Sequence, residues 1–183
     1  MAVILEPNSL YIATQMLDED STENFHWSFF ITDAAGDIEQ HEWNMVLGKS
    51  WEKYQHYTIS DLQATSGPAI YLSFTKLSGN WNPPSSDILQ DSLSMVFEER
   101  TDIHYCRNRD KGLSCRTWVT KAVRMFVQKG WLFIPTREAW RAIEPNVIIR
   151  SRLAALIYLD MKNSQNASNF TPSYGLIDCA LDN

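Results

Sequence analysis

The strongest constraint on the fold is a pair of alternating segments joined by a short turn. Residues 25–32 read Phe-His-Trp-Ser-Phe-Phe-Ile-Thr, and residues 37–45 read Asp-Ile-Glu-Gln-His-Glu-Trp-Asn-Met. Alternation with period two is typical of strands that bury one face. Between them, Asp33-Ala34-Ala35-Gly36 fits a three-residue hairpin loop with Gly36 in the left-handed conformation. The sequence therefore predicts an antiparallel hairpin.

The length of this loop decides which residues face one another. With a three-residue loop, Asn44 lies directly opposite His26, whereas an even-numbered loop places Met45 there and His41 opposite Phe30. In the second register His41 shares a face with His26 but lies four residues along, about 13 Å away. Asn44 is therefore the better candidate to orient the His26 ring.

A second feature is a helix that begins at a cysteine. Ser114 is a favoured N-cap residue, the apolar residues after it recur with helical spacing, and Gly130 marks the end. Cys115 falls on the first turn, where unpaired backbone N–H groups and the helix dipole favour a thiolate and are placed to receive an oxyanion. Four basic residues nearby would raise the local potential, or would alternatively form only a solvated loop: Arg107, Arg109, Lys111 and Arg116. A cysteine packed as a small apolar side chain is the alternative interpretation.

The remaining pattern predicts one α+β domain over residues 1–183, with an antiparallel sheet packed against helices. Residues 9–16 indicate a strand or short helix, and residues 103–106 a strand or loop. Further strands are expected near 56–59 and 69–77, and helices at 86–100 and 147–162. A short helix beginning near Pro135 is expected to end at Pro145, and the polar tail from about residue 163 is expected to be frayed.

Charge and cysteine content exclude several classes of function. A net charge of -6 disfavours binding to nucleic acid, and the longest apolar run, residues 153–159, is too short to span a membrane. Three cysteines without a Cys-x-x-Cys pair suggest neither a disulfide framework nor a structural zinc site. With no recognisable signal peptide, we expect a cytoplasmic protein with a small-molecule substrate, no metal and no cofactor. The sequence does not indicate an oligomeric state.

Thiol catalysis needs a nucleophile, a base within hydrogen-bonding reach and a group that orients the base. Cys115, His26 and Asn44 are the candidates for these roles, and His41 and His104 are alternatives for the base or the orienting group. The substrate is expected to contact neighbours of the cysteine and histidine: Trp27, Arg116 and Trp118.

These residues also carry a resemblance to known proteins. The arrangement resembles the circularly permuted branch of the papain-like NlpC-type superfamily, which includes lecithin:retinol acyltransferase. The matching features are His26-Trp27 on a strand, a polar residue on the next strand, and Cys115-Arg116-Thr117-Trp118-Val119 on a helix. The same motifs are closer still to a fungal domain family of unknown function with His-Trp and Gly-Cys-Arg-(aromatic)-Trp motifs. The resemblance implies a permuted papain-like fold and thiol-dependent acyl transfer, or hydrolysis of an amide or ester, in small-molecule secondary metabolism.

A second interpretation uses the same scaffold without covalent chemistry. The many tryptophans would then line a small-molecule pocket, an interaction surface or the pocket of a biosynthetic cyclase. The position of His26 relative to the Cys115 sulfur distinguishes the two interpretations.

Overall fold

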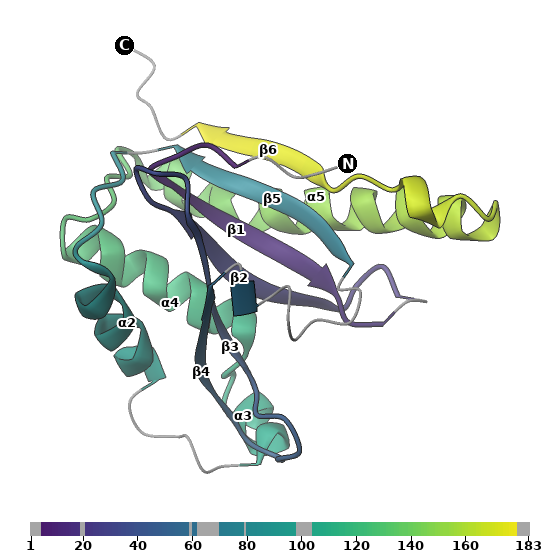
Figure 1. Cartoon of the computed structure of the whole chain (residues 1–183). Coiled ribbons are helices and arrows are strands. Elements are labelled where there is room, and N and C mark those ends of the chain that lie inside the picture. The colour runs from purple at the N-terminus through teal and green to yellow at the C-terminus, as the bar shows by residue number, and fades with distance from the viewer. Residues whose placement is uncertain are drawn as a thin grey trace.

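The computed structural model describes residues 5–18, 21–58, 60–61, 70–78, 80–97 and 104–178 of the chain. In this part of the chain a six-stranded sheet has the order β4-β3-β2-β1-β5-β6 (Figure 1). The strands are β1 (Ser9–Met16), β2 (Phe25–Thr32), β3 (Ile38–Met45), β4 (Glu52–Thr58), β5 (Tyr71–Ser78) and β6 (Ser173–Asp178). Neighbours among β1 to β5 are antiparallel, and β6 runs parallel to β5.

The helices are α2 (Ser86–Ser94), α3 (Tyr105–Asp110), α4 (Cys115–Gln128) and α5 (Arg137–Asn163), with short 3₁₀ turns η1 (Met95–Phe97) and η2 (Ala167–Asn169). This confirms the predicted α+β class, with an antiparallel sheet packed against helices. None of the helices in the described ranges is long and apolar enough to cross a membrane.

The predicted hairpin and its register are both present. Gly36 has a φ of 88°, and Ser28 pairs with Glu42 as the three-residue loop requires. Asp33 supports the turn because its carboxylate accepts hydrogen bonds from the N–H groups of Ala35 and Asp37. The register of the site-bearing strands therefore follows from the chemistry of this turn.

Helices α4 and α5 pack against one face of the sheet (Figure 1). The centre of this core is aromatic: Phe29 of β2 lies 5.6 Å from the Trp118 ring and 5.4 Å from the Phe126 ring, both on α4. Helix α5 adds a buried polar contact, because the Ser151 hydroxyl lies 2.7 Å from the hydroxyl of Thr14 on β1. The apolar stripe of α4 thus fixes the helix against β2.

Pro145 does not end a helix, contrary to the sequence-based prediction. It lies inside α5, which runs without a break for 27 residues. Proline removes one backbone donor, but Pro145 is exposed, so water can satisfy the carbonyl that this donor would have bonded. Ile143 and Val147 are buried on either side and hold both halves of the helix against the core.

Two further segments differ from expectation. Tyr105 and Cys106 belong to the short helix α3 rather than to a strand or loop, and His104 caps this helix by accepting a hydrogen bond from the Cys106 N–H. Residues 173–178, in the segment expected to be a frayed tail, form β6 and pair with β5. A strand can be added there because the edge of β5 presents unpaired backbone groups.

Replacing Phe126 by Ala should lower the free energy of unfolding by about 3–5 kcal/mol, because its ring fills the space between Phe29 and Trp81. Urea unfolding followed by tryptophan fluorescence measures this change. Leu47→Ala is the matched control: Leu47 is 98% exposed, so the change should stay within about 0.5 kcal/mol. Equal effects of the two substitutions would contradict the described core.

Candidate active site

Cys115 is the first residue of α4, as the sequence predicts. Ser114 has an extended backbone, and its hydroxyl accepts a hydrogen bond from the Thr117 N–H at 3.2 Å. The Thr117 hydroxyl in turn accepts from the Ser114 N–H at 2.8 Å. This reciprocal cap satisfies the N–H groups of Ser114 and Thr117. The N–H groups of Cys115 and Arg116 still have no acceptor within the helix. Positive backbone charge is therefore concentrated beside the thiol.

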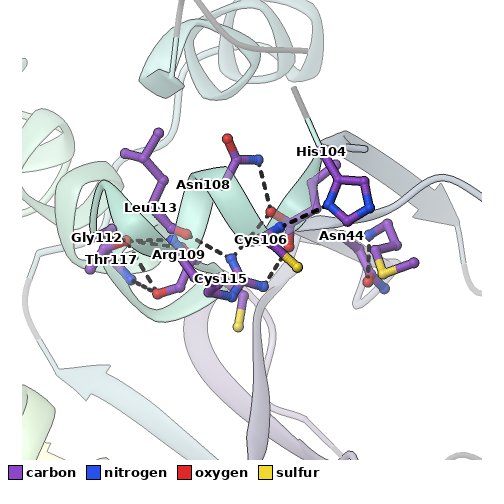
Figure 2. A network of polar contacts seen from close by, with 12 residues as sticks. Asn44, His104, Cys106, Asn108, Arg109, Gly112, Leu113, Cys115 and Thr117 are labelled. Atoms are coloured by element: carbon purple, nitrogen blue, oxygen red, sulfur yellow. Dashed lines mark hydrogen bonds and ion pairs between the residues drawn. The ribbon is translucent and has the colours of Figure 1, made fainter. Parts of the chain in front are cut away.

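A buried carboxylate anchors the segment that leads into α4. Glu52 of β4 pairs with the Arg109 guanidinium and accepts a hydrogen bond from the Asn108 amide at 3.0 Å. Arg109 also donates to the Leu113 carbonyl (Figure 2), and the Leu113 N–H donates to the Asn108 carbonyl. These contacts fix the turn immediately before the cysteine. The positive charge of Arg109 also contributes to lowering the pKa of Cys115.

The sulfur lies against the backbone edge of β2. The sulfur is 4.0 Å from the Phe25 carbonyl oxygen, and the Trp27 backbone N–H donates a hydrogen bond to the sulfur. Among the described pairs, the β2–β3 ladder runs from Ser28 to Thr32 and does not include residues 25–27. The thiol therefore occupies the edge of β2 at the point where β3 diverges from it.

His26 lies between the thiol and a carboxylate. Its Nε2 is 2.8 Å from Oε2 of Glu42, and the ring also forms a hydrogen bond with the Cys115 side chain. His26 and Glu42 are each 4% exposed and Cys115 is 8% exposed. A chain of thiol, imidazole and carboxylate is thus enclosed almost completely.

The protonation states follow from these contacts. Burial alone would lower the pKa of His26, but the hydrogen bonds to Cys115 and Glu42 outweigh it and raise the pKa to about 10. Burial alone would raise the pKa of Cys115, but the hydrogen bond and charge of His26 hold it below the usual range. Both shifts favour the thiolate–imidazolium pair over the neutral thiol and imidazole.

Side chains of β3 and β5 hold Glu42 in place. The Gln40 amide donates to Oε2 at 2.8 Å, and the Asn44 amide donates to Oε1 at 2.9 Å. The Tyr71 hydroxyl donates to the side-chain amide oxygen Oε1 of Gln40 at 3.0 Å. Burial alone would raise the pKa of Glu42, but the hydrogen bonds from His26, Asn44 and Gln40 lower it. The carboxylate therefore stays charged and correctly oriented beside the ring.

The structure brings Cys115 and His26 together but places Asn44 one contact further away. Asn44 bonds to Glu42, and Glu42 takes the role next to the ring that the sequence analysis assigns to Asn44. Glu42 lies on the same face of β3, and its side chain is one methylene longer, so it reaches the ring diagonally. The sequence did contain a signal for Glu42, because the predicted register places this acidic residue opposite Ser28.

The alternative histidines lie elsewhere. His41 faces the helix side of the sheet, where its Nδ1 is 2.8 Å from the Tyr54 hydroxyl. His104 caps α3 and stacks on Tyr105. Neither histidine contacts the thiol among the interactions described. Trp118 is completely buried in the core, which excludes direct substrate contact in this conformation.

A pocket of about 470 Å³ opens beside the thiol. Cys115, Trp27 and Arg116 all line it, as the sequence analysis expects for substrate-contacting residues. A second pocket of about 520 Å³ lies between α4 and α5 and shares Trp27, Ile148 and Arg152 with the first. The lining of the second pocket is mainly apolar and includes Val119, Val123, Trp140, Ile143 and Ile149. The two pockets meet at these shared residues and form a groove whose thiol end is of mixed polarity and whose other end is mainly apolar.

Cys115 should be the most reactive thiol in the chain towards limiting iodoacetamide, because only a thiolate is alkylated rapidly. The alkylation rate should reach its plateau below the ordinary thiol pKa of about 8.5, since the pKa of Cys115 is lowered. The plateau should last until His26 loses its proton near pH 10. Peptide mass spectrometry across a pH series measures this profile.

The matched variant is His26→Ala, which should move the midpoint of Cys115 alkylation to higher pH by removing the positive partner. Cys106 is exposed and serves as the internal reference, while Cys179 lies outside the described residues. Faster labelling of Cys106 or Cys179 than of Cys115 would contradict an activated thiol.

Comparisons with protein-family models, with curated proteins and with solved structures find no match to this chain. The site itself presents a buried thiol beside an imidazole that a held carboxylate orients.

Proposed function

We propose that the protein is a cysteine-dependent enzyme that transfers or hydrolyses acyl groups. The observation that carries this proposal is the continuous hydrogen-bonded chain from Cys115 through His26 to Glu42, beside a pocket. A nucleophile, a base and an orienting group in contact are the parts that covalent acyl transfer requires. Simple core packing would not require a lowered thiol pKa or a carboxylate held by two amides.

In the first half-reaction, the Cys115 thiolate attacks the carbonyl carbon of an ester, thioester or amide. The carbonyl oxygen becomes an oxyanion, which the free N–H groups of Cys115 and Arg116 are positioned to receive. The His26 imidazolium gives its proton to the leaving alcohol, thiol or amine as the bond to carbon breaks. The products are a thioester on Cys115 and a neutral imidazole.

In the second half-reaction, His26 acts as a base. It takes a proton from water or from an alcohol or amine acceptor, which attacks the thioester carbon. The Cys115 thiolate then leaves, and His26 is again an imidazolium. Glu42 keeps the ring in one orientation throughout and stabilises its positive charge, while Gln40 and Asn44 prevent the carboxylate from turning away.

The groove supports a substrate with an apolar part. The pocket beside Cys115 continues into the apolar pocket between α4 and α5, so an apolar acyl or leaving group fits there while its carbonyl reaches the sulfur. Arg124 and Arg141 outnumber Glu144 in the lining of the second pocket, whereas Arg152 is paired with Glu23. This excess of positive charge favours a substrate that also carries negative charge. The combination suits a small metabolite, as in secondary metabolism.

A permuted papain-like arrangement, with the histidine strand before the cysteine helix, is part of the proposal. The histidine strand β2 comes before the cysteine helix α4, and α4 packs against β2. Catalytic thiol sites are defined by geometry and role rather than by order along the chain.

Incubation with activated acyl esters of increasing chain length should give a covalent adduct on Cys115, detected by intact-protein and peptide mass spectrometry. Cys115→Ala should abolish both the adduct and turnover, whereas Cys106→Ala should leave them unchanged. His26→Ala should slow turnover by about 10²–10⁴-fold. Glu42→Gln should slow it more than Asn44→Ala, because only Glu42 touches the ring.

Full turnover in Cys115→Ala would show that the groove acts without a thioester. Binding of the same esters without any adduct on the wild-type protein would instead favour a non-catalytic pocket or a cyclase pocket without a covalent step. Circular dichroism of each variant confirms that the fold is retained.

A further inference from the structure

A second cluster of chemically active side chains lies on the opposite face of β3 from Glu42. It consists of Glu39, His41 and His56, and none of the three contacts the thiol site among the interactions described. The geometry points to a binding site for a divalent transition-metal ion, with zinc as the best fit, formed by these three residues. This site goes beyond the proposed acyl-transfer function and does not depend on it.

The sheet register builds the cluster. His41 of β3 and His56 of β4 are directly paired across the ladder, and their rings lie 4.8 Å apart. Glu39 lies two residues before His41 and therefore points from the same face of β3. Three potential ligands from two adjacent strands thus converge without any long loop.

The distances suit a tetrahedral ion. Nε2 of His41 is 3.3 Å from Oε2 of Glu39, and Nε2 of His56 is 3.4 Å from the same oxygen. Two ligands bound to zinc at about 2.0–2.1 Å with tetrahedral angles lie about 3.3–3.4 Å apart. All three ligand atoms lie within 4.8 Å of one another, so small side-chain rotations bring them onto one ion.

Two of the three ligand atoms lack a well-formed hydrogen bond. Nε2 of His41 and Nε2 of His56 are buried, and each only approaches the shared Oε2 of Glu39, at 3.3 and 3.4 Å. His41 is 0% exposed, so water does not solvate its ring. Buried polar atoms are normally satisfied, and a metal ion at this point would satisfy both nitrogens and the carboxylate together.

The surrounding residues hold the ligands as metal ligands are usually held. The Tyr54 hydroxyl lies 2.8 Å from Nδ1 of His41, so an Nδ1–H donor leaves the Nε2 lone pair directed at the cluster. The Ser86 hydroxyl donates to both oxygens of Glu39, at 3.0 and 3.1 Å. Each of these contacts fixes a ligand in the orientation that binding requires.

The ligand set selects the kind of ion. Calcium and magnesium prefer sites built from oxygen ligands, whereas two imidazoles and one carboxylate suit zinc and its neighbours in the first transition row. The side chains of Glu39 and His56 are 30% and 21% exposed, which leaves room for water as a fourth ligand.

The test uses the full chain, stripped with a chelator and titrated with zinc chloride in a calorimeter. One equivalent should bind the wild-type protein, and His56→Ala and Glu39→Gln should each abolish that binding. Tyr54→Phe keeps all three ligands and the ring, but should weaken zinc binding by about 10–100-fold through loss of the hydroxyl beside His41. His104→Ala, which removes an exposed histidine outside the cluster, should bind as the wild type does.

Cys115→Ala and His26→Gln distinguish this site from the thiol site, and both should keep full zinc stoichiometry. Cobalt substitution gives a second readout: an absorption spectrum without a thiolate-to-cobalt charge-transfer band is expected. Absence of stoichiometric binding to the wild type, undiminished binding to His56→Ala, or loss of binding in Cys115→Ala together with a thiolate band would each overturn the inference.

Discussion

The buried charge pair between Cys115 and His26 is the interaction on which the site depends. Removing two charges from water costs several kcal/mol each, and their mutual attraction compensates only when further hydrogen bonds satisfy the remaining groups. Here the Trp27 N–H and the start of α4 serve the thiolate, and Glu42 serves the imidazolium. Loss of any one partner leaves an unbalanced charge in a nearly enclosed space, so the surrounding network has to be complete.

Two structural features make this pair possible. The first is the divergence of β3 from β2 beyond Ser28, which frees the backbone edge that receives the sulfur. The second is the Glu52 anchor, which ties α3 and the following turn to β4 and so fixes where α4 begins. The hydrophobic core keeps α4 against β2, while these polar contacts set the position of its first residue to the accuracy that a hydrogen bond to His26 demands.

Much of this arrangement could be predicted from local sequence signals. The Asp33 to Gly36 turn determined the register, and Ser114 together with Gly130 marked the bounds of α4, because turn and cap chemistry involve only a few adjacent residues. The helix end predicted at Pro145 was wrong because burial of Ile143 and Val147 outweighs the local helix-breaking preference of proline. That Glu42 rather than Asn44 contacts the His26 ring depends on side-chain reach across diverging strands. The Glu39–His41–His56 cluster depends on the pairing of β3 with β4, which no local pattern specified.

The protonation state of His26 tests the central claim most directly. Nuclear magnetic resonance of the protein labelled at its histidine rings follows each of the four imidazoles through a pH titration. The His26 ring should stay protonated at pH 8, titrate near pH 10, and return towards the ordinary histidine range of about 6.5 in Cys115→Ala. A His26 ring that is already neutral at pH 8 in the wild-type protein, or that titrates identically in Cys115→Ala, would contradict the thiolate–imidazolium pair.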